Sequence, residues 1–352
     1  MTKIWIDTSP LCNQNSTRGI GKYTKLLIKS LREESGIEIL DEKKENAFEA
    51  DIIHYPYFDF FFPTLKIINK KKTVVTIHDC IPLVFPDKYP SGIKGKINLL
   101  KQKISLKKVS AIITDSENSK KDIIKYLRIP EGIIHVVYLA ADSKYKIICD
   151  KKKIAGEISN KYKIQSKFLL YVGDVNYNKN ISGIINAFNI LSKEDSRLSL
   201  VLVGKSFENK NLAEIKRIKE EITLNNLSGK VKILGFVPDD DLVKIYNLAE
   251  VFCLPSFYEG FGIGILEAMA CGCPVVTGNV SSMPEVAGGA AVLVDPRSPP
   301  EISSAIKKIV SNQDFRNKLI KSGINQSQIF SWKKTVDEVC GVYKSVLEET
   351  EI

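Results

Sequence analysis

The sequence predicts an α/β protein with two doubly wound parallel sheets. Its 352 residues exceed what one hydrophobic core usually organises, so two domains are expected. Short runs rich in β-branched residues alternate with helix-like segments, the pattern of parallel strands covered by helices. This alternation restarts after the lysines at 151–153. We therefore predict domains over residues 1–155 and 156–331, followed by a separate helix over 332–352.

In the first domain, five strand-like runs lead into polar loops or helical segments. The expected strands cover 3–7, 51–54, 73–77, 111–114 and 133–137. A helix over about 21–34 follows the first strand. Ser119 and Asp122 have the spacing of a capping box, which predicts a helix that ends near Leu127.

In the second domain, six strands alternate with helices. The expected strands cover 168–172, 198–203, 231–234, 251–254, 274–276 and 291–294. The expected helices cover 181–191, 212–225, 240–249, 264–270, 300–310 and, without a strand partner, 332–347. Ligands bind at the carboxyl ends of such strands, so two facing sheets are expected to hold a ligand in the cleft between them. The linker near 150–165 would then be a hinge.

The composition excludes several classes of protein. Apolar residues make up 44% and charged residues 26%, as in soluble globular proteins, and no apolar run approaches the roughly 18 residues of a membrane span. The first residues lack the features of a secretory signal, so we expect a cytoplasmic protein. Seven scattered cysteines, an odd number, favour reduced thiols. Cys271 and Cys273 lack a second pair at ligand spacing, so no metal site is predicted.

The positive charge is concentrated in the first half of the chain. Residues 1–150 carry 25 basic and 18 acidic side chains, against 26 and 23 in the rest. Six lysines and no acid lie between Lys94 and Lys108. Apolar residues recur there at helical spacing: Ile93, Ile97, Leu100 and Ile104. The segment predicts a basic amphipathic helix, which would attract anionic lipid headgroups by about 1 kcal/mol per well-placed charge. A solvated helix packed on a core has the same pattern.

Glu259 and Glu267 enclose a glycine-rich segment that follows a predicted strand and runs into a helix. The alternate glycines Gly260, Gly262 and Gly264 let the backbone approach a ligand, and free NH groups at a helix start favour a diphosphate. If the span were helical, the carboxylates would stand about 12 Å apart. That suits hydrogen bonds to both ends of a sugar nucleotide and exceeds the spacing of about 10 Å or less in glycoside hydrolases. The alternative is two solvated glutamates beside a glycine turn.

This segment resembles the E-x7-E motif of retaining glycosyltransferase family 4. Further similar segments cover nearly the whole chain: 18–23 from Arg18 to Tyr23, 76–79, 253–256, 267–276, 282–288 and 294–296. The resemblance implies the GT-B fold, two Rossmann-like domains with the active site between them. It also implies that the helix over 332–352 crosses back onto the first domain.

The resemblance implies roles for residues of the second domain. Glu259 would contact the donor sugar and Glu267 the ribose. Backbone amides would bind the sugar and phosphates: those of Phe261, Gly262 and Ile263. Lys179 resembles the lysine that neutralises the leaving diphosphate, a catalytic role. Val237 would touch the nucleobase through its backbone.

One departure from the family concerns the surroundings of that lysine. The family often has an arginine nearby, where this chain has Asn178 and Asp174. Part of the diphosphate clamp is therefore expected elsewhere, with Lys205 as a candidate.

In the first domain, His78 ends a strand at the edge that faces the expected cleft. The resemblance implies that it contacts the donor sugar or the transition state, whereas without the resemblance a structural histidine is favoured. Asp79 and Ser116 are expected to line the same cleft.

Gly19 and Gly21 lie between the first strand and its helix, where a loop would close over phosphate or acceptor. Thr24 occupies the third glycine position of a dinucleotide fingerprint, so a nicotinamide cofactor is not expected. The acids at 239–241 resemble metal-binding carboxylates but follow Pro238 at a helix start, where acids cap NH groups. We predict a cap there and no cofactor.

The sequence thus predicts metal-independent, retaining transfer of a sugar from a nucleotide diphosphate to a hydroxyl of a glycan or polyprenyl-linked acceptor. Segments 18–23 and 78–86 look most like bacterial mannosyltransferases of surface-polysaccharide assembly, which favours GDP-mannose. Peripheral attachment to the inner membrane face through 94–108 is consistent with this. One alternative is a nucleotide-sugar epimerase of the same architecture. Another takes the net charge of +10 as nucleic-acid binding, which is disfavoured because the basic cluster lacks interleaved aromatics.

Overall fold

The computed structural model describes residues 1–12, 19–40, 44–68 and 71–348. The chain forms two compact units: unit 1 contains Met1–Leu139 together with the segment that starts at Ser331, and unit 2 is Ala140–Phe330. The division after Leu139 lies before the boundary predicted at 155. Arg18, part of the segment that resembles family 4, lies outside the described residues.

Unit 1 is built on a parallel six-stranded sheet with strand order β2-β1-β3-β4-β5-β6. The strands are β1 (Thr2–Ile6), β2 (Ile37–Ile39), β3 (Ile52–Tyr55), β4 (Lys72–Thr76), β5 (Ala111–Thr114) and β6 (Ile134–Val136). Five agree with the predicted strands to within one residue at each end, and β2 was missed. Three half-exposed residues at the edge of a sheet carry too little pattern to predict a strand.

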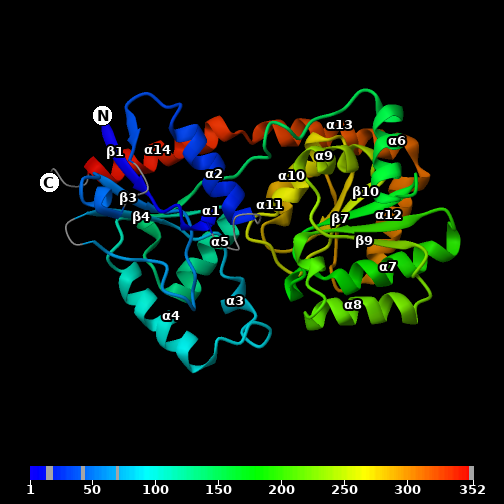
Figure 1. The fold of residues 1–352 in the computed structure, drawn as a ribbon, viewed down its shortest axis with the longest axis horizontal. Coiled ribbons are helices and arrows are strands. Elements are labelled where there is room, and N and C mark those ends of the chain that lie inside the picture. Colours follow the sequence, from blue (N-terminus) through cyan, green and yellow to red (C-terminus); the bar gives the residue numbers. More distant parts are fainter. Residues whose placement is uncertain (13–18, 41–43, 69–70, 349–352) are drawn as a thin grey trace. The chain divides into compact units, whose positions relative to one another are not determined.

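Helices lie on both faces of this sheet (Figure 1). They are α1 (Ser9–Cys12), α2 (Gly19–Leu31), α3 (Ile81–Val84), α4 (Gly92–Leu106), α5 (Glu117–Asp122) and α14 (Trp332–Glu348), with 3₁₀ turns at Lys44–Phe48 and Glu131–Ile133. A π-helical turn, Ile123–Leu127, extends α5. The predicted cap of α5 was wrong: Ser116, not Ser119, is the N-cap, because its Oγ accepts a hydrogen bond from the Ser119 amide.

The last helix, α14, belongs to the core of unit 1. It packs against α2 and contacts β4 and β5, and its buried side chains recur at spacings of three and four residues. Tyr343 on α14 lies 2.6 Å from Nδ1 of the buried His54 on β3. The helix predicted over 332–347, for which the sequence showed no strand partner, therefore completes one face of the first sheet.

Unit 2 also contains a parallel six-stranded sheet, ordered β12-β11-β10-β7-β8-β9. The strands are β7 (Phe168–Val172), β8 (Ser199–Val203), β9 (Val231–Leu234), β10 (Val251–Leu254), β11 (Val275–Gly278) and β12 (Val292–Val294). All six were predicted to within two residues at each end, because the central strands are apolar along their whole length.

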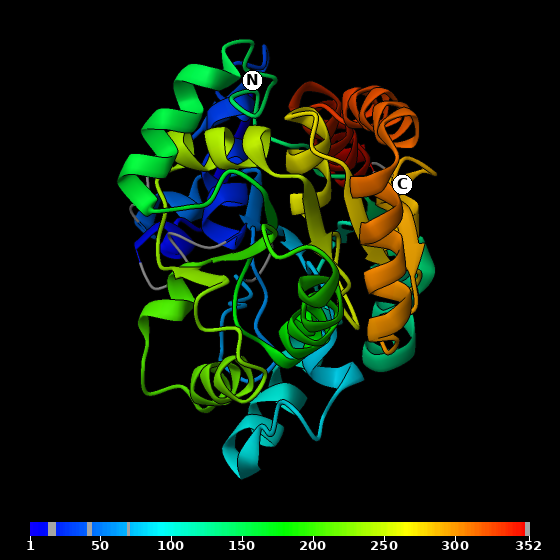
Figure 2. The same cartoon turned by 90° about the vertical axis from the view of Figure 1, so that its right-hand side faces the viewer.

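Helices cover both faces of the second sheet. They are α6 (Lys151–Tyr162), α7 (Ile181–Glu194), α8 (Ala213–Leu224), α9 (Asp239–Leu248), α10 (Ile263–Ala270), α11 (Met283–Ala287), α12 (Pro299–Ser311) and α13 (Gln313–Ile329). Figure 2 looks onto this unit; α7, α8 and α12 pack together, and α6, α9, α10 and α13 form the other layer.

The predicted hinge at 150–165 was wrong. Asp150 caps α6 by accepting a hydrogen bond from the Lys153 amide, and Ile154 and Ile158 are buried one turn apart. Helix α6 packs against α9, and Lys161 pairs with Asp241 at 2.6 Å. The lysines that suggested a linker lie on the exposed face of a docked helix.

Within the described residues, no helix is both long and apolar enough to cross a membrane. Four of the seven cysteines are buried as free thiols: Cys80, Cys253, Cys271 and Cys273. Cys12 and Cys149 are exposed.

Candidate active site

The predicted donor residues of unit 2 follow β7 and β10, two neighbouring strands at the centre of the sheet. From β7 the chain continues to β8 on one side, and from β10 it continues to β11 on the other. In doubly wound sheets this reversal of strand order opens a crevice at the carboxyl ends of the strands, where ligands bind. Lys179 ends the 3₁₀ turn Tyr177–Lys179 after β7, and Glu259 lies in the loop after β10.

Lys179 and Glu259 form an ion pair. Nζ of Lys179 lies 2.9 Å from Oε1 and 2.8 Å from Oε2 of Glu259. The side chains are only 20% and 6% exposed, so the pair is shielded from water on most sides. Oγ of Ser256 donates a second short hydrogen bond of 2.6 Å to Glu259 Oε1. The structure therefore brings two of the predicted catalytic residues into direct contact.

The loops after β7 and β10 are joined by further hydrogen bonds. Asn178, at a position where family 4 often has arginine, donates from Nδ2 to the Tyr258 carbonyl and accepts at its own carbonyl from the Phe257 amide. Its side chain is buried, so it positions the second loop and offers no charge to a phosphate.

Asn180 ties a third loop to these two. Its Nδ2 donates to the carbonyls of Pro255 at 2.9 Å and Pro296 at 2.6 Å, and its Oδ1 accepts from the Gly183 amide to cap α7. Its φ of 52° lies in the left-handed region, which asparagine tolerates better than most residues. Sequence reasoning missed both Asn180 and Ser256. The N-cap position directly after Lys179 was the available signal for Asn180.

The glycine-rich segment forms the amino end of α10. Gly262 is the N-cap with φ of 89°, a conformation that favours glycine. Phe261 has a buried side chain packed on Phe330, so it can offer only its backbone to a ligand. Ser282 Oγ donates to the carbonyls of Glu259 and Phe261, which fixes the turn. The predicted amides of Phe261, Gly262 and Ile263 thus lie at a rigid helix start.

Gly264 was assigned the wrong role. It is the second residue of α10, and a Cβ there would lie 3.0 Å from Cζ of Phe252 on β10. Its small size permits close packing of the helix on the strand, and ligand approach depends on the residues before it.

Glu267 lies inside α10, largely buried, and accepts a 3.1 Å hydrogen bond from the hydroxyl of Tyr246. Burial and the charge of Glu267 raise the pKa of Tyr246 well above its ordinary value, so the phenol remains a donor. The loop from Glu259 to Gly262 is not helical, so the 12 Å separation inferred for a continuous helix does not apply.

Three glycines follow the adjacent strands β7, β8 and β9: Gly173, Gly204 and Gly235. Lys205 comes next after Gly204 as an exposed side chain at the same edge of the sheet as Lys179. Val237 is buried and can contribute only backbone groups. Sequence reasoning missed Phe236, which is 52% exposed at the end of β9 and offers an aromatic face to a base.

The three acids lie in the first turn of α9, but the predicted cap was wrong, because Pro238 is the N-cap and no side-chain hydrogen bond caps this helix. Asp239 pairs with Lys144 at 2.6 Å, and Asp241 with Lys161. Among the described residues, no group of three or more potential ligands could hold a metal ion.

In unit 1, both ring nitrogens of His78 face groups that can only accept hydrogen bonds. Nδ1 lies 2.7 Å from Oδ2 of Asp115, and Nε2 lies 3.1 Å from the Pro56 carbonyl. Both bonds form only when both nitrogens carry hydrogen. Burial by itself lowers the pKa of His78, but the charge and hydrogen bond of Asp115, with Asp79, outweigh it and raise the pKa above its ordinary value. The contacts of His78 therefore favour its imidazolium form over the free base.

This ion pair should make unit 1 less stable as the pH rises. A histidine whose pKa is raised on folding contributes stability below its unfolded pKa of about 6.5, and that stability is lost as the pH rises through the folded pKa. Burial, followed by the charge of His78, lowers the pKa of His54 to about 3, so His54 is neutral in both states above about pH 7.5. In denaturant titrations, the unfolding free energy of unit 1 should decline above about pH 6.5 in the native protein. The His78→Gln variant should lack this decline. An equal dependence of the unfolding free energy on pH in the native protein and the variant would contradict the paired imidazolium.

The other predicted residues of unit 1 have structural roles. Asp79 Oδ1 accepts from the Ile81 amide at the start of α3. Ser116, expected to line the cleft, is fully buried as the cap of α5. Gly19 and Gly21 lie in the first turn of α2, because this helix begins two residues earlier than expected.

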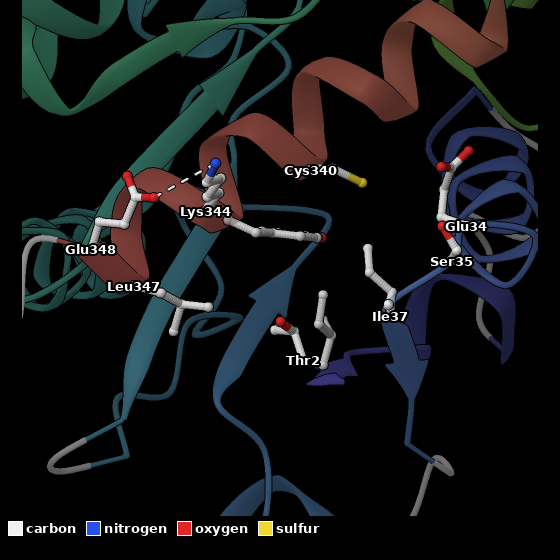
Figure 3. A pocket seen from close by; sticks show the side chains of 11 residues that line it. Thr2, Glu34, Ser35, Ile37, Cys340, Lys344, Leu347 and Glu348 are labelled. Carbon is white, nitrogen blue, oxygen red and sulfur yellow. Dashed lines mark ion pairs between the residues drawn. The ribbon is translucent and has the colours of Figure 1, made fainter.

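A hollow of about 390 Å³ lies elsewhere in unit 1 (Figure 3). It is bounded by Thr2 at the start of β1 and by Cys340, Lys344 and Glu348 on α14. The hollow lies at the amino ends of the strands, opposite the edge of the sheet that carries His78. It contains none of the predicted site residues.

Two doubly wound, Rossmann-like units are the domains of the GT-B fold. The whole chain superposes on sucrose-phosphate synthase from Thermosynechococcus elongatus with a TM-score of 0.77, 17% identity, and coverage of 99% of this chain and 100% of that one. It also resembles Anabaena HepE in complex with UDP and glucose, with a TM-score of 0.75, 18% identity, and coverage of 98% and 100%.

Sequence comparison gives the family. Residues 19–145 match Glycosyltransferase Family 4, and residues 155–326 match Glycosyl transferases group 1. O-antigen chain mannosyltransferase B of Escherichia coli is 30% identical over 97% of this chain and 88% of that protein. The chain belongs to glycosyltransferase family 4, and it is a glycosyltransferase.

Proposed function

We propose that this enzyme transfers mannose from GDP-mannose, with retention of configuration, to a hydroxyl of a polyprenyl-linked glycan in surface-polysaccharide assembly. The observation that carries the proposal is the contact of Lys179 with Glu259 at the switch point of unit 2, beside the amino end of α10. The mannosyltransferase relative that spans almost the whole chain supports the choice of sugar.

Donor binding exchanges the partners of this ion pair. The diphosphate takes the ammonium of Lys179 and the amides at the start of α10, and sugar hydroxyls donate to Glu259, which Ser256 continues to hold. Glu267 accepts from the ribose hydroxyls, and the backbone around Val237 contacts the base. Lys205 is a second cation for the phosphates.

In the reaction, the bond between the anomeric carbon and the β-phosphate oxygen breaks while the acceptor oxygen bonds to the same face. The acceptor proton passes to the departing phosphate. Lys179 stabilises the negative charge that develops on the diphosphate, so the protein supplies the cation without a metal ion. Glu259 is held by two donors and does not act as the nucleophile.

Unit 1 is proposed to receive the acceptor, with the His78 cation near the transferring group. A lipid-linked acceptor would bring the enzyme to the inner face of the cytoplasmic membrane.

A panel of GDP-, UDP-, ADP- and dTDP-sugars tests the donor. A ligand that binds only the folded state raises the melting temperature, by an amount equivalent to about 2.7 kcal/mol at 100 times its Kd. GDP-mannose is expected to give the largest shift, and transfer to a lipid-linked acceptor should yield the α-anomer by NMR and persist in EDTA. A larger shift with another nucleotide sugar would identify a different donor. A product with inverted configuration would contradict the retaining mechanism. Formation of an epimerised sugar in the absence of acceptor would support the epimerase alternative instead of sugar transfer.

A further inference from the structure

Helix α4 presents an apolar stripe to solvent. The four apolar residues of the predicted amphipathic helix are exposed: Ile93 at 82%, Ile97 at 51%, Leu100 at 63% and Ile104 at 54%. Both overall views show the helix on the outer side of unit 1 (Figures 1 and 2). The sequence predicted the amphipathic helix and left open whether its apolar face packs on the core; the structure exposes that face.

The geometry of the helix places lysines along both borders of this stripe. At about 100° per residue, the four apolar residues fall within an arc of about 60°. Lys94 and Lys101 follow one border, and Lys96 and Lys103 the other. Lys103 also donates to the Tyr126 carbonyl, and Lys107 and Lys108 extend the basic surface beyond the end of the helix.

The opposite face of α4 is fixed to unit 1, so the stripe cannot rotate inward. Gln102 is buried and donates to the carbonyls of Asp59 and Phe62, and Asn98 donates to the Phe61 carbonyl. A Cβ at Gly95 would lie 3.4 Å from Phe61 Cβ, so this face of the helix is in contact with the loop that carries Phe61. The loop held by these bonds adds the exposed ring of Phe62 beside the helix.

We propose that the outer face of α4 binds the surface of an anionic lipid bilayer. The helix would lie in the plane of the interface, its stripe inserted among the acyl chains and its lysines at the headgroups. A basic polar face that flanks an apolar stripe is the composition of interfacial helices. No acid lies between Lys94 and Lys108, so a second copy would meet like charge along both borders. Nucleic acid would leave the four aliphatic side chains without an apolar partner. The proposal holds whichever donor and acceptor the enzyme uses.

Sedimentation of the full chain with unilamellar vesicles tests the apolar stripe. The native protein should bind vesicles of phosphatidylcholine with phosphatidylglycerol and stay unbound with phosphatidylcholine alone. Ile97→Ser combined with Leu100→Ser should lower the partition constant at least about 100-fold, equivalent to about 1.5 kcal/mol for each side chain. The matched control is Leu224→Ser with Ile329→Ser, which replaces two exposed aliphatic residues of unit 2 and should leave binding unchanged.

The lysines are tested in the same assay. Lys94→Gln with Lys101→Gln should weaken binding about 30-fold, equivalent to about 1 kcal/mol for each charge, and less at high salt. Lys216→Gln with Lys219→Gln, two exposed positions on α8, removes the same charge and should have little effect.

Insertion of the apolar stripe into the bilayer can be measured separately by tryptophan fluorescence. An Ile97→Trp variant should show a blue shift with anionic vesicles beyond that of the native protein, whose tryptophans are the buried Trp5 and the half-buried Trp332. Native protein that stays unbound to phosphatidylglycerol vesicles would overturn the proposal, as would equal losses in the control variants. Self-association without lipid that Ile97→Ser with Leu100→Ser abolishes would assign the surface to a second copy.

Discussion

Replacing Lys179 by methionine is expected to lower the rate of sugar transfer about 10²- to 10³-fold, the effect of removing one group aimed at developing negative charge. The methionine side chain keeps the length of the lysine stem without the ammonium. The loss should appear mainly in kcat, because the charge on the leaving diphosphate is greatest in the transition state. A variant with native turnover would exclude Lys179 from the chemistry.

The same change should destabilise unit 2. Glu259 would remain almost fully buried with Ser256 as its donor and no cation beside it. Breaking a buried ion pair from one side costs about 3–5 kcal/mol, and the partial exposure of Lys179 places the expected loss near the lower end.

A double variant separates these two effects. Lys179→Met with Glu259→Gln removes the stranded charge, so the midpoint of denaturant unfolding should recover while activity does not. Lys307→Met is the matched control, because Lys307 pairs with Glu194 on an exposed surface and should change stability by less than about 1 kcal/mol. A double variant less stable than Lys179→Met alone would contradict the buried-pair argument.

Replacing Gly204 by alanine is expected to destabilise unit 2 by about 3 kcal/mol or more. A Cβ at this position would lie 2.0 Å from the carbonyl oxygen of Gly173, a backbone atom that cannot swing aside. The amide of Gly204 donates to the Gly235 carbonyl and that of Gly173 to the Val203 carbonyl, so three strand ends would have to separate. Gly173 begins the loop that leads to Lys179, so donor affinity should also fall.

Gly229→Ala provides the comparison. Its Cβ would meet no atom within 4 Å, and its φ lies outside the left-handed region, so the change in unfolding free energy should stay within about 0.5 kcal/mol. If both variants unfold at the same denaturant concentration, the close approach of the strand ends is not a constraint.

Parts of the structure that depend on a local sequence pattern were predicted, and parts that depend on tertiary packing were not. The strands β7, β8 and β10 are apolar along their length, and only a strand buried on both faces explains that pattern. Lys179 was predicted only through the resemblance to family 4, and Glu259 through that resemblance together with the glycine-rich segment that it precedes. Their direct contact was not, because it depends on the order of strands in the sheet.

The errors share a cause in tertiary packing. Periodicity located α4 correctly but could not say which of its faces meets the core, and here the buried side is made of Gly95, Gln102 and Leu106. Two buried isoleucines of α6 were too few to outweigh the lysines around them. The exchange of Ser116 and Ser119 at the start of α5 reflects a backbone geometry that spacing does not specify.

The position of α14 has a consequence for how the chain is made. Unit 2 is continuous in sequence, whereas the sheet of unit 1 is covered on one face by a helix that is synthesised after unit 2. During synthesis the cluster around Val74 and Ile113 therefore lacks its α14 side chains until unit 2 has been translated. The core of the unit that begins first is completed only after the second unit has been made.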